Sequence, residues 1–187
     1  PVQEIAFSIS NAIAVLDAVR RCVASASAAE ALAYRKQRGL SADDVRMAVL
    51  VQELVPADAA AVVFSANPIS GSCDEMMINS NWGLGESIVG GIATPDTFTV
   101  DKATLAVTWR GIARKDRMTV MTNGGTAEAE VPAELRDRPS LTDEQVTEIA
   151  RLALKLEQAT GRPVDVECAI AREKLYLLQC RPITTLG

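Results

Sequence analysis

The segment from Pro163 to Thr184, PVDVECAIAREKLYLLQCRPIT, constrains the fold more than any other part of this sequence. Two short apolar runs flank a polar stretch at residues 172–174, which is typical of two β-strands joined by a tight turn. Polar side chains interrupt these runs at Glu167, Gln179 and Arg181. Alternate residues of a strand face the same side, so Gln179 and Arg181 share a face. A loop at 172–174 places residue 167 opposite residue 179, which puts Glu167 on that face as well.

A carboxylate, an amide oxygen and a guanidinium on one sheet face suit a Mg²⁺ ion and the phosphates that it carries. The same residues fit a second interpretation, in which Glu167 and Arg181 form a structural ion pair on a solvated face. The apolar residues around them predict a sheet that is covered on both sides. A charge in such a place needs a ligand, a metal or a counter-charge. The residues by themselves leave both interpretations open.

The composition fits an ordinary globular protein, with 187 residues, 48% of them hydrophobic and 23% charged. Such a chain can form one domain or two small lobes. A net charge of −5 argues against a nucleic-acid surface, but not against a nucleotide ligand. The sequence has no apolar run near the roughly 18 residues of a membrane span and no signal-peptide pattern. We therefore expect a cytoplasmic protein that binds neither nucleic acid nor membrane.

The cysteine and histidine content limits which disulfides, metal ligands and catalytic bases this chain can provide. The four cysteines, Cys22, Cys73, Cys168 and Cys180, form no CxxC pair, which favours reduced thiols over a disulfide or a zinc site. A pairing of Cys168 with Cys180 across the predicted hairpin is compatible with the sequence, and such a pairing more often means packing than bonding. The sequence contains no histidine, which excludes an imidazole base, a histidine metal ligand and a phosphohistidine. Because the sequence opens on Pro1 without a methionine, we expect a fragment or an excised lobe.

The pattern of apolar residues predicts two helical regions. Residues 11–38 have helical spacing, with Asn11 as a possible N-cap and Gly39 as a stop, and fit one long helix or two successive helices. Residues 141–160 form the clearest helix, with a capping box of Thr142 and Gln145 at its start and Gly161 at its end. We expect a helical entry segment at 1–45, a sheet with a glycine-rich loop at 46–122, a mobile connection at 123–140, and a helix with a hairpin at 141–187.

Strand-like runs occupy much of the remaining sequence. They lie at residues 46–55, 59–65, 75–79, 97–100, 106–112 and 118–121. Helices followed by mostly antiparallel strands, then by a helix and a hairpin, predict an α+β lobe with flanking helices.

Two further features allow a functional interpretation. The run Gly83-Leu84-Gly85-Glu86 is similar to a phosphate loop, although glycines in turns commonly supply only backbone freedom. Gln52 interrupts an apolar run that we predict to be a strand. Burying an amide without a partner costs about 1–3 kcal/mol, so Gln52 should bond a neighbouring backbone or a ligand base.

Several segments in a fixed order resemble one known family. They are VQELVPADAAAVVFSANPISG, INSNWGLGESIVGGIATPDTFTVDK, LTDEQVTEIARLALKLEQATGRPVDVECAI and LYLLQCRPIT. Together they resemble the ATP-binding domain of pyruvate phosphate dikinase-type enzymes, a family that includes phosphoenolpyruvate synthase and rifampicin phosphotransferase. The resemblance extends from about residue 4 to residue 184. It departs from the family pattern at Cys168, where tryptophan is common, and at Glu173, where glycine is common in the turn.

The resemblance implies an ATP-grasp fold that holds ATP and Mg²⁺ between two lobes, of which this chain resembles the second. It implies that Glu167 and Gln179 bind the metal, that Arg181 binds the ATP phosphates, and that Gln52 lies at the adenine. It places no catalytic residue in this chain, since positioning and charge neutralisation carry phosphoryl transfer.

The resemblance also implies partners outside this sequence. These are a first lobe with a phosphate-binding lysine and arginine, and a swivelling domain whose histidine passes the phosphoryl group to pyruvate or to an antibiotic. We therefore expect the chain to be inactive alone. An alternative is a non-catalytic or degenerate nucleotide-binding module. A third possibility is a structural lobe whose uncovered apolar face drives self-association.

Overall fold

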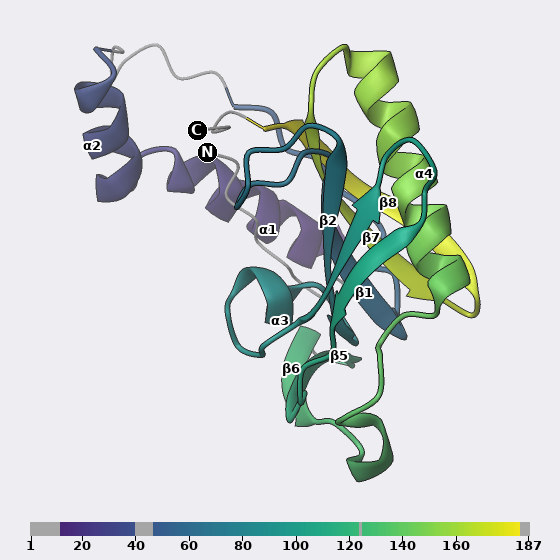
Figure 1. Ribbon diagram of the computed structural model, residues 1–187. Helices are drawn as coiled ribbons and strands as arrows, with labels where there is room; N and C mark the ends of the chain where they lie inside the picture. The colour runs from purple at the N-terminus through teal and green to yellow at the C-terminus, as the bar shows by residue number, and fades with distance from the viewer. Residues whose placement is uncertain (1–11, 40–46, 124, 184–187) are drawn as a thin grey trace. The chain divides into compact units, whose positions relative to one another are not determined.

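The computed structural model describes residues 12–39, 47–123 and 125–183 of the chain (Figure 1). The chain divides into two compact units. The first consists of Pro1–Leu54 with Thr122–Thr126, and the second of Val55–Met121 with Ala127–Gly187. No helix within the described ranges is both long and apolar enough to cross a membrane.

Within its described residues the first unit contains two successive helices, which is one of the two arrangements that the sequence allowed. They are α1 (Ala12–Ser25) and α2 (Ala29–Gln37), and Asn11, the expected N-cap, lies outside the described residues. Residues 47–54 have no regular secondary structure, so the strand predicted at 46–55 is wrong over its described part. No described strand pairs with this stretch, and an apolar run without a hydrogen-bonded neighbour does not make a strand. Gln52 is exposed there.

The second unit is built on an antiparallel sheet of six strands in the order β4-β3-β2-β1-β7-β8. These strands are β1 (Ala59–Phe64), β2 (Glu75–Trp82), β3 (Asp96–Asp101), β4 (Val107–Gly111), β7 (Val164–Ala171) and β8 (Lys174–Pro182). The helices are α3 (Glu86–Val89), the short 3₁₀ helix η1 (Ala133–Leu135) and α4 (Asp143–Thr160). The predicted α+β class with a mainly antiparallel sheet is confirmed.

A separate two-stranded sheet joins β5 (Arg117–Thr122) to β6 (Gly125–Glu130). Residues 123–140 therefore contain β6 and η1, although we expected a connection without regular structure there. The sequence of β6, GTAEAE, consists of small and charged residues and is mostly exposed. Strand β6 forms because it pairs with β5 and not because it buries an apolar face. For this reason a search for alternating hydrophobic residues does not detect it.

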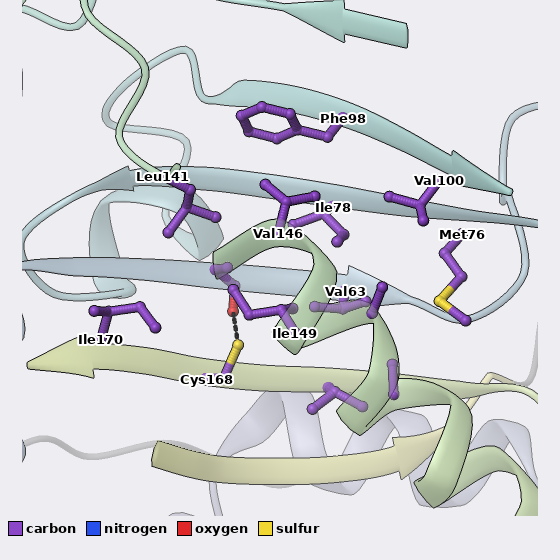
Figure 2. Close-up of a cluster of buried hydrophobic side chains, with 14 of the residues drawn as sticks. Val63, Met76, Ile78, Phe98, Val100, Leu141, Val146, Ile149, Cys168 and Ile170 are labelled. Atoms are coloured by element: carbon purple, nitrogen blue, oxygen red, sulfur yellow. Dashed lines mark hydrogen bonds between the residues drawn. The ribbon is translucent and has the colours of Figure 1, made fainter. Parts of the chain in front are cut away.

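Helix α4 packs across one face of the large sheet and forms the core with it (Figure 1). Alternate strand residues such as Val63, Ile78 and Phe98 point toward Val146 and Ile149 of the helix (Figure 2). All of these side chains are at most 1% exposed. Removing this apolar area from water is the main force that holds helix and sheet together.

The ends of α4 are fixed as its sequence predicts. The Thr142 side chain accepts a hydrogen bond from the Gln145 backbone N–H, and the Gln145 side chain accepts one from the Thr142 N–H, which completes the capping box. Gly161 ends the helix with a φ of 70°. Because α4 leads directly into β7, its position also fixes where the C-terminal hairpin begins.

A buried ion pair joins the start of β3 to the segments on either side of the small sheet. Lys115 Nζ donates to Asp96 Oδ1 at 2.6 Å, and both side chains are fully buried. The second oxygen, Asp96 Oδ2, accepts hydrogen bonds from the backbone N–H and the hydroxyl of Ser140 at 2.7 and 2.8 Å. The Ala113 N–H donates to Oδ1 at 3.0 Å. Both carboxylate oxygens therefore have partners, as a buried charge requires.

We predict that Lys115→Met destabilises the protein by about 3–5 kcal/mol, because it leaves the Asp96 carboxylate buried without its counter-charge. Urea unfolding followed by circular dichroism measures this loss. The control is Arg114→Met, which removes a neighbouring cation that is 58% exposed and pairs with Asp116 and Asp137. That change should cost less than about 1 kcal/mol. Equal effects of the two substitutions would contradict the role given to the buried pair.

Candidate functional site

Strands β7 and β8 form a hairpin with a two-residue turn. Arg172 and Glu173 have φ values of 51° and 62°, the pair of left-handed conformations found in a type I′ turn. Ala171 pairs with Lys174, so the predicted three-residue loop at 172–174 is wrong. Glu173 adopts the left-handed conformation expected for this turn, which favours glycine.

A β-bulge in β8 changes the register halfway along the hairpin. Near the turn Cys168 pairs with Leu177, and beyond the bulge Glu167 pairs with Gln179, so Leu178 is the extra residue. The predicted pairing of Glu167 with Gln179 is therefore confirmed, although the loop assumed for it is not. A two-residue turn without the bulge would place Gln179 opposite Val166, on the face that packs against α4.

The bulge brings the predicted site residues onto one face of the sheet. Glu167 and Gln179 form one cross-strand row, and Asp165 and Arg181 form the next. Residues directly opposite each other in an antiparallel pair share a face, so all of these side chains lie on the side away from the α4 core. Sequence reasoning missed Asp165. The alternation of β7 contained the signal, since Asp165 and Glu167 are two residues apart.

Arg181 pairs with Asp165 more closely than with Glu167. Its Nε donates to Asp165 Oδ2 at 2.8 Å, whereas its Nη2 lies 4.0 Å from Glu167 Oε1. The carboxylate side chains are only 11% and 14% exposed, while the Arg181 side chain is 53% exposed. Two largely buried carboxylates thus face one guanidinium that is open to solvent. Among the described residues, these two carboxylates and the one guanidinium leave a net negative charge beside an exposed cation.

One carboxylate oxygen of this group is left without a hydrogen-bond partner. Asp165 Oδ1 is buried and accepts no hydrogen bond from any described residue. A buried acceptor of this kind costs free energy unless a donor or a cation reaches it. Together with the Glu167 carboxylate and the Gln179 amide oxygen, it gives a set of hard oxygen donors suited to Mg²⁺. In chemical type, these oxygen atoms match the ligands that Mg²⁺ prefers.

The described residues contain no group of three or more histidine, cysteine, aspartate or glutamate side chains arranged around a metal. A cation at the hairpin would thus have two carboxylates and an amide from this chain. Mg²⁺ commonly binds in this way, with one or two protein carboxylates while water and phosphate oxygens supply the other ligands.

The glycine-rich run after β2 allows two backbone segments to lie in close contact. Gly83 has a φ of 74°, and a Cβ at this position would lie 2.2 Å from the carbonyl oxygen of Thr119. The Leu84 N–H donates to that same oxygen at 2.8 Å. Glycine is required at residue 83 by this close approach of two backbones, which supports the structural interpretation of Gly83-Leu84-Gly85-Glu86.

The two hairpin cysteines lie on the core face and do not pair with each other. Cys168 is opposite Leu177 and Cys180 is opposite Val166, so the two thiols share a face without being directly opposite each other. All four cysteines are free. Burial, with a smaller contribution from the Glu167 charge, raises the pKa of Cys168 to about 12. Burial and the nearby Asp165 charge also raise the pKa of Cys180.

We predict that the cysteines react with a thiol reagent in a fixed order. Cys73 is exposed and should react first with a disulfide reagent at pH 8, whereas Cys168 is 1% exposed and should not react in the folded protein. Since the thiolate is the reactive form, raising the pH toward 9 should leave Cys168 unreactive because its pKa is about 12. Mass spectrometry of the labelled peptides measures this. Labelling of Cys168 at the rate of Cys73 would contradict the burial described here.

The fold and the hairpin are consistent with a lobe of the ATP-grasp type. The family model described as "Pyruvate phosphate dikinase, AMP/ATP-binding domain" matches residues 2–187. This chain belongs to that family.

Individual relatives carry related names. A probable phosphoenolpyruvate synthase of Methanocaldococcus jannaschii is 41% identical over 98% of this chain and 16% of its own length. The phosphoenolpyruvate synthase of Pyrococcus furiosus is 38% identical over 98% of this chain and 24% of its own length. A rifampicin phosphotransferase of Streptomyces sviceus is 34% identical over 98% of this chain and 21% of its own length. The chain thus spans about a quarter or less of these relatives.

Proposed function

We propose that this chain is the second lobe of the ATP-binding domain of an ATP- and Mg²⁺-dependent phosphotransferase. The observation that carries the proposal is the pair of rows Glu167–Gln179 and Asp165–Arg181, which share one face of an edge hairpin. Membership of an AMP/ATP-binding family supports a nucleotide as the ligand. Asp165 Oδ1, which is buried and accepts no hydrogen bond from the part of the chain that the structure describes, supports a cation beside it.

Each residue has a separate role in this proposal. Glu167 and Gln179 hold Mg²⁺, which would neutralise phosphate charge during transfer. Arg181 binds the phosphates, with its guanidinium oriented by the 2.8 Å bond to Asp165. Asp165 thus positions Arg181 through Oδ2, and its Oδ1 is proposed as a further oxygen facing the cation. Gln52, exposed in the first unit, is proposed as an adenine contact.

The remaining parts of the enzyme lie outside this sequence in our proposal. A first ATP-grasp lobe would bring further phosphate-binding cations. A separate domain would bring the histidine that takes the phosphoryl group and passes it to a small acceptor, such as pyruvate or an antibiotic. The short span of this chain within its relatives supports this division. We therefore propose that the chain has no turnover alone, and that the complete enzyme acts in the cytoplasm.

We predict that Glu167→Gln and Arg181→Ala each weaken Mg-ATP binding about tenfold or more, because each removes a charge that faces the metal or a phosphate. Isothermal titration of the complete protein measures the affinity. Glu173→Gln, which changes an exposed turn residue of the same hairpin, is the matched control and should bind as the unaltered protein does.

A double variant with Glu167→Gln and Arg181→Ala that retains full Mg-ATP affinity would contradict the site assignment. ATP binding that is unchanged when Mg²⁺ is removed would contradict the metal role alone. Binding without any phosphoryl transfer by the complete protein would favour the non-catalytic nucleotide-binding module instead.

A further inference from the structure

Tyr176 lies on the same face of the hairpin as the proposed metal-binding row. It pairs with Ala169, which is two residues from Glu167 on β7 and therefore points to the same side. Successive residues on one face of a strand are about 7 Å apart, so Tyr176 occupies the cross-strand row next to Glu167 and Gln179. The roles proposed above for the hairpin do not include this tyrosine.

The bulge at Leu178 is the reason that Tyr176 and Gln179 share a face. These two residues are three positions apart, and a regular strand would turn them to opposite sides. A hairpin with a three-residue loop and no bulge would also pair Glu167 with Gln179. It would, however, place Tyr176 opposite Ile170, whose side chain belongs to the core against α4. The observed turn and bulge therefore differ from that simpler hairpin by bringing an aromatic ring to the site face.

Hydrogen bonds to the start of β1 hold the two-residue turn. Asp58 Oδ2 accepts from the Arg172 N–H at 2.7 Å, and the Asp58 N–H donates to the Ile170 carbonyl at 2.8 Å. Arg172 and Glu173 both have positive φ values, which residues other than glycine adopt at a cost in free energy. The Asp58 carboxylate offsets part of this cost. Because the turn is fixed in this way, the side on which Tyr176 emerges is fixed as well.

A neighbouring cation orients the Tyr176 ring. Lys174 lies two residues earlier on β8, and its Nζ is 5.1 Å from the centre of the ring, within the range of a cation–π attraction. Ala169, the partner of Tyr176 across the hairpin, is small, and Tyr176 itself is partly exposed. This row therefore presents one oriented aromatic ring that is partly open to solvent.

We propose that the Tyr176 ring packs against the nucleoside part of the nucleotide that the hairpin binds. This inference rests on the proposed function of the hairpin. The row that contains Arg181 lies on one side of the metal-binding row, and Tyr176 lies on the other. A nucleotide whose phosphates meet Arg181 and the cation extends its ribose and base in the opposite direction, over Tyr176. An aromatic ring suits that end of the ligand, because bases stack on aromatic side chains.

The test compares the affinity for Mg-ATP with the affinity for Mg-tripolyphosphate, which has the three phosphates but no nucleoside. Isothermal titration of the complete phosphotransferase measures both. Tyr176→Ala should weaken Mg-ATP binding about tenfold, because it removes the stacking contact, and should leave tripolyphosphate binding unchanged. Tyr176→Phe keeps the ring and should bind both ligands nearly as the unaltered protein does.

Tyr34→Ala is the matched control for the loss of a tyrosine. Tyr34 of α2 is 42% exposed, and the guanidinium carbon of Arg38 lies 5.6 Å from the centre of its ring, so it resembles Tyr176 in chemistry but lies outside the hairpin. This substitution should change neither affinity.

Two outcomes would overturn the nucleoside contact. Unchanged Mg-ATP affinity in Tyr176→Ala would show that the ring does not touch the ligand. An equal loss of affinity for both ligands would show that the substitution disturbs the metal-binding row and removes no contact with the nucleoside. Failure of the unaltered protein to bind Mg-ATP, or Mg-ATP binding that Glu167→Gln leaves unchanged, would instead overturn the proposed function itself.

Discussion

One extra residue in β8, Leu178, determines which hairpin side chains can act together. The two-residue turn at Arg172 and Glu173 sets a register that would place Gln179 and Arg181 opposite Val166 and Val164, against the α4 core. The bulge shifts that register by one residue and turns both side chains to the face that carries Asp165 and Glu167. The turn and the bulge together therefore keep the polar residues of β8 away from the apolar face of β7.

The charged side chains on this face are compatible with both interpretations that the sequence left open, a structural ion pair and a cation-binding site. An ion pair does form, but Arg181 makes it with Asp165 and not at close range with Glu167. The pairing leaves Asp165 Oδ1 buried without a hydrogen-bond donor from the described residues. It also leaves Glu167 largely buried beside Gln179. A structural ion pair and a cation site are thus compatible here, because the two hairpin rows contain two carboxylates and one guanidinium among the described residues.

Sequence patterns predicted the elements that follow a local rule. The capping box of Thr142 and Gln145, the stop at Gly161 and the alternating strands of the core depend on neighbouring residues, and all are present. The strand predicted at residues 46–55 was wrong over its described part, and β6 was not predicted, because strand formation in both places depends on whether a partner lies alongside. The pairing of Glu167 with Gln179 was predicted correctly from an incorrect loop length, since sequence reveals neither the I′ turn nor the bulge that compensates for it. Asp165 was missed because its role depends on the residue opposite it.

The proposed site requires Gln179, Glu167 and a nucleotide-bound cation to meet on one face of the hairpin. Replacing Mg²⁺ with paramagnetic Mn²⁺ in the ATP complex tests this directly, with the side-chain amide signals followed by ¹H–¹⁵N NMR. Mn-ATP should broaden the Gln179 amide signal, excess Mg²⁺ should restore it, and the exposed Gln158 of α4 should keep its signal throughout. A Gln179 signal that stays sharp while ATP is bound with Mn²⁺ would show that the cation does not bind at this face.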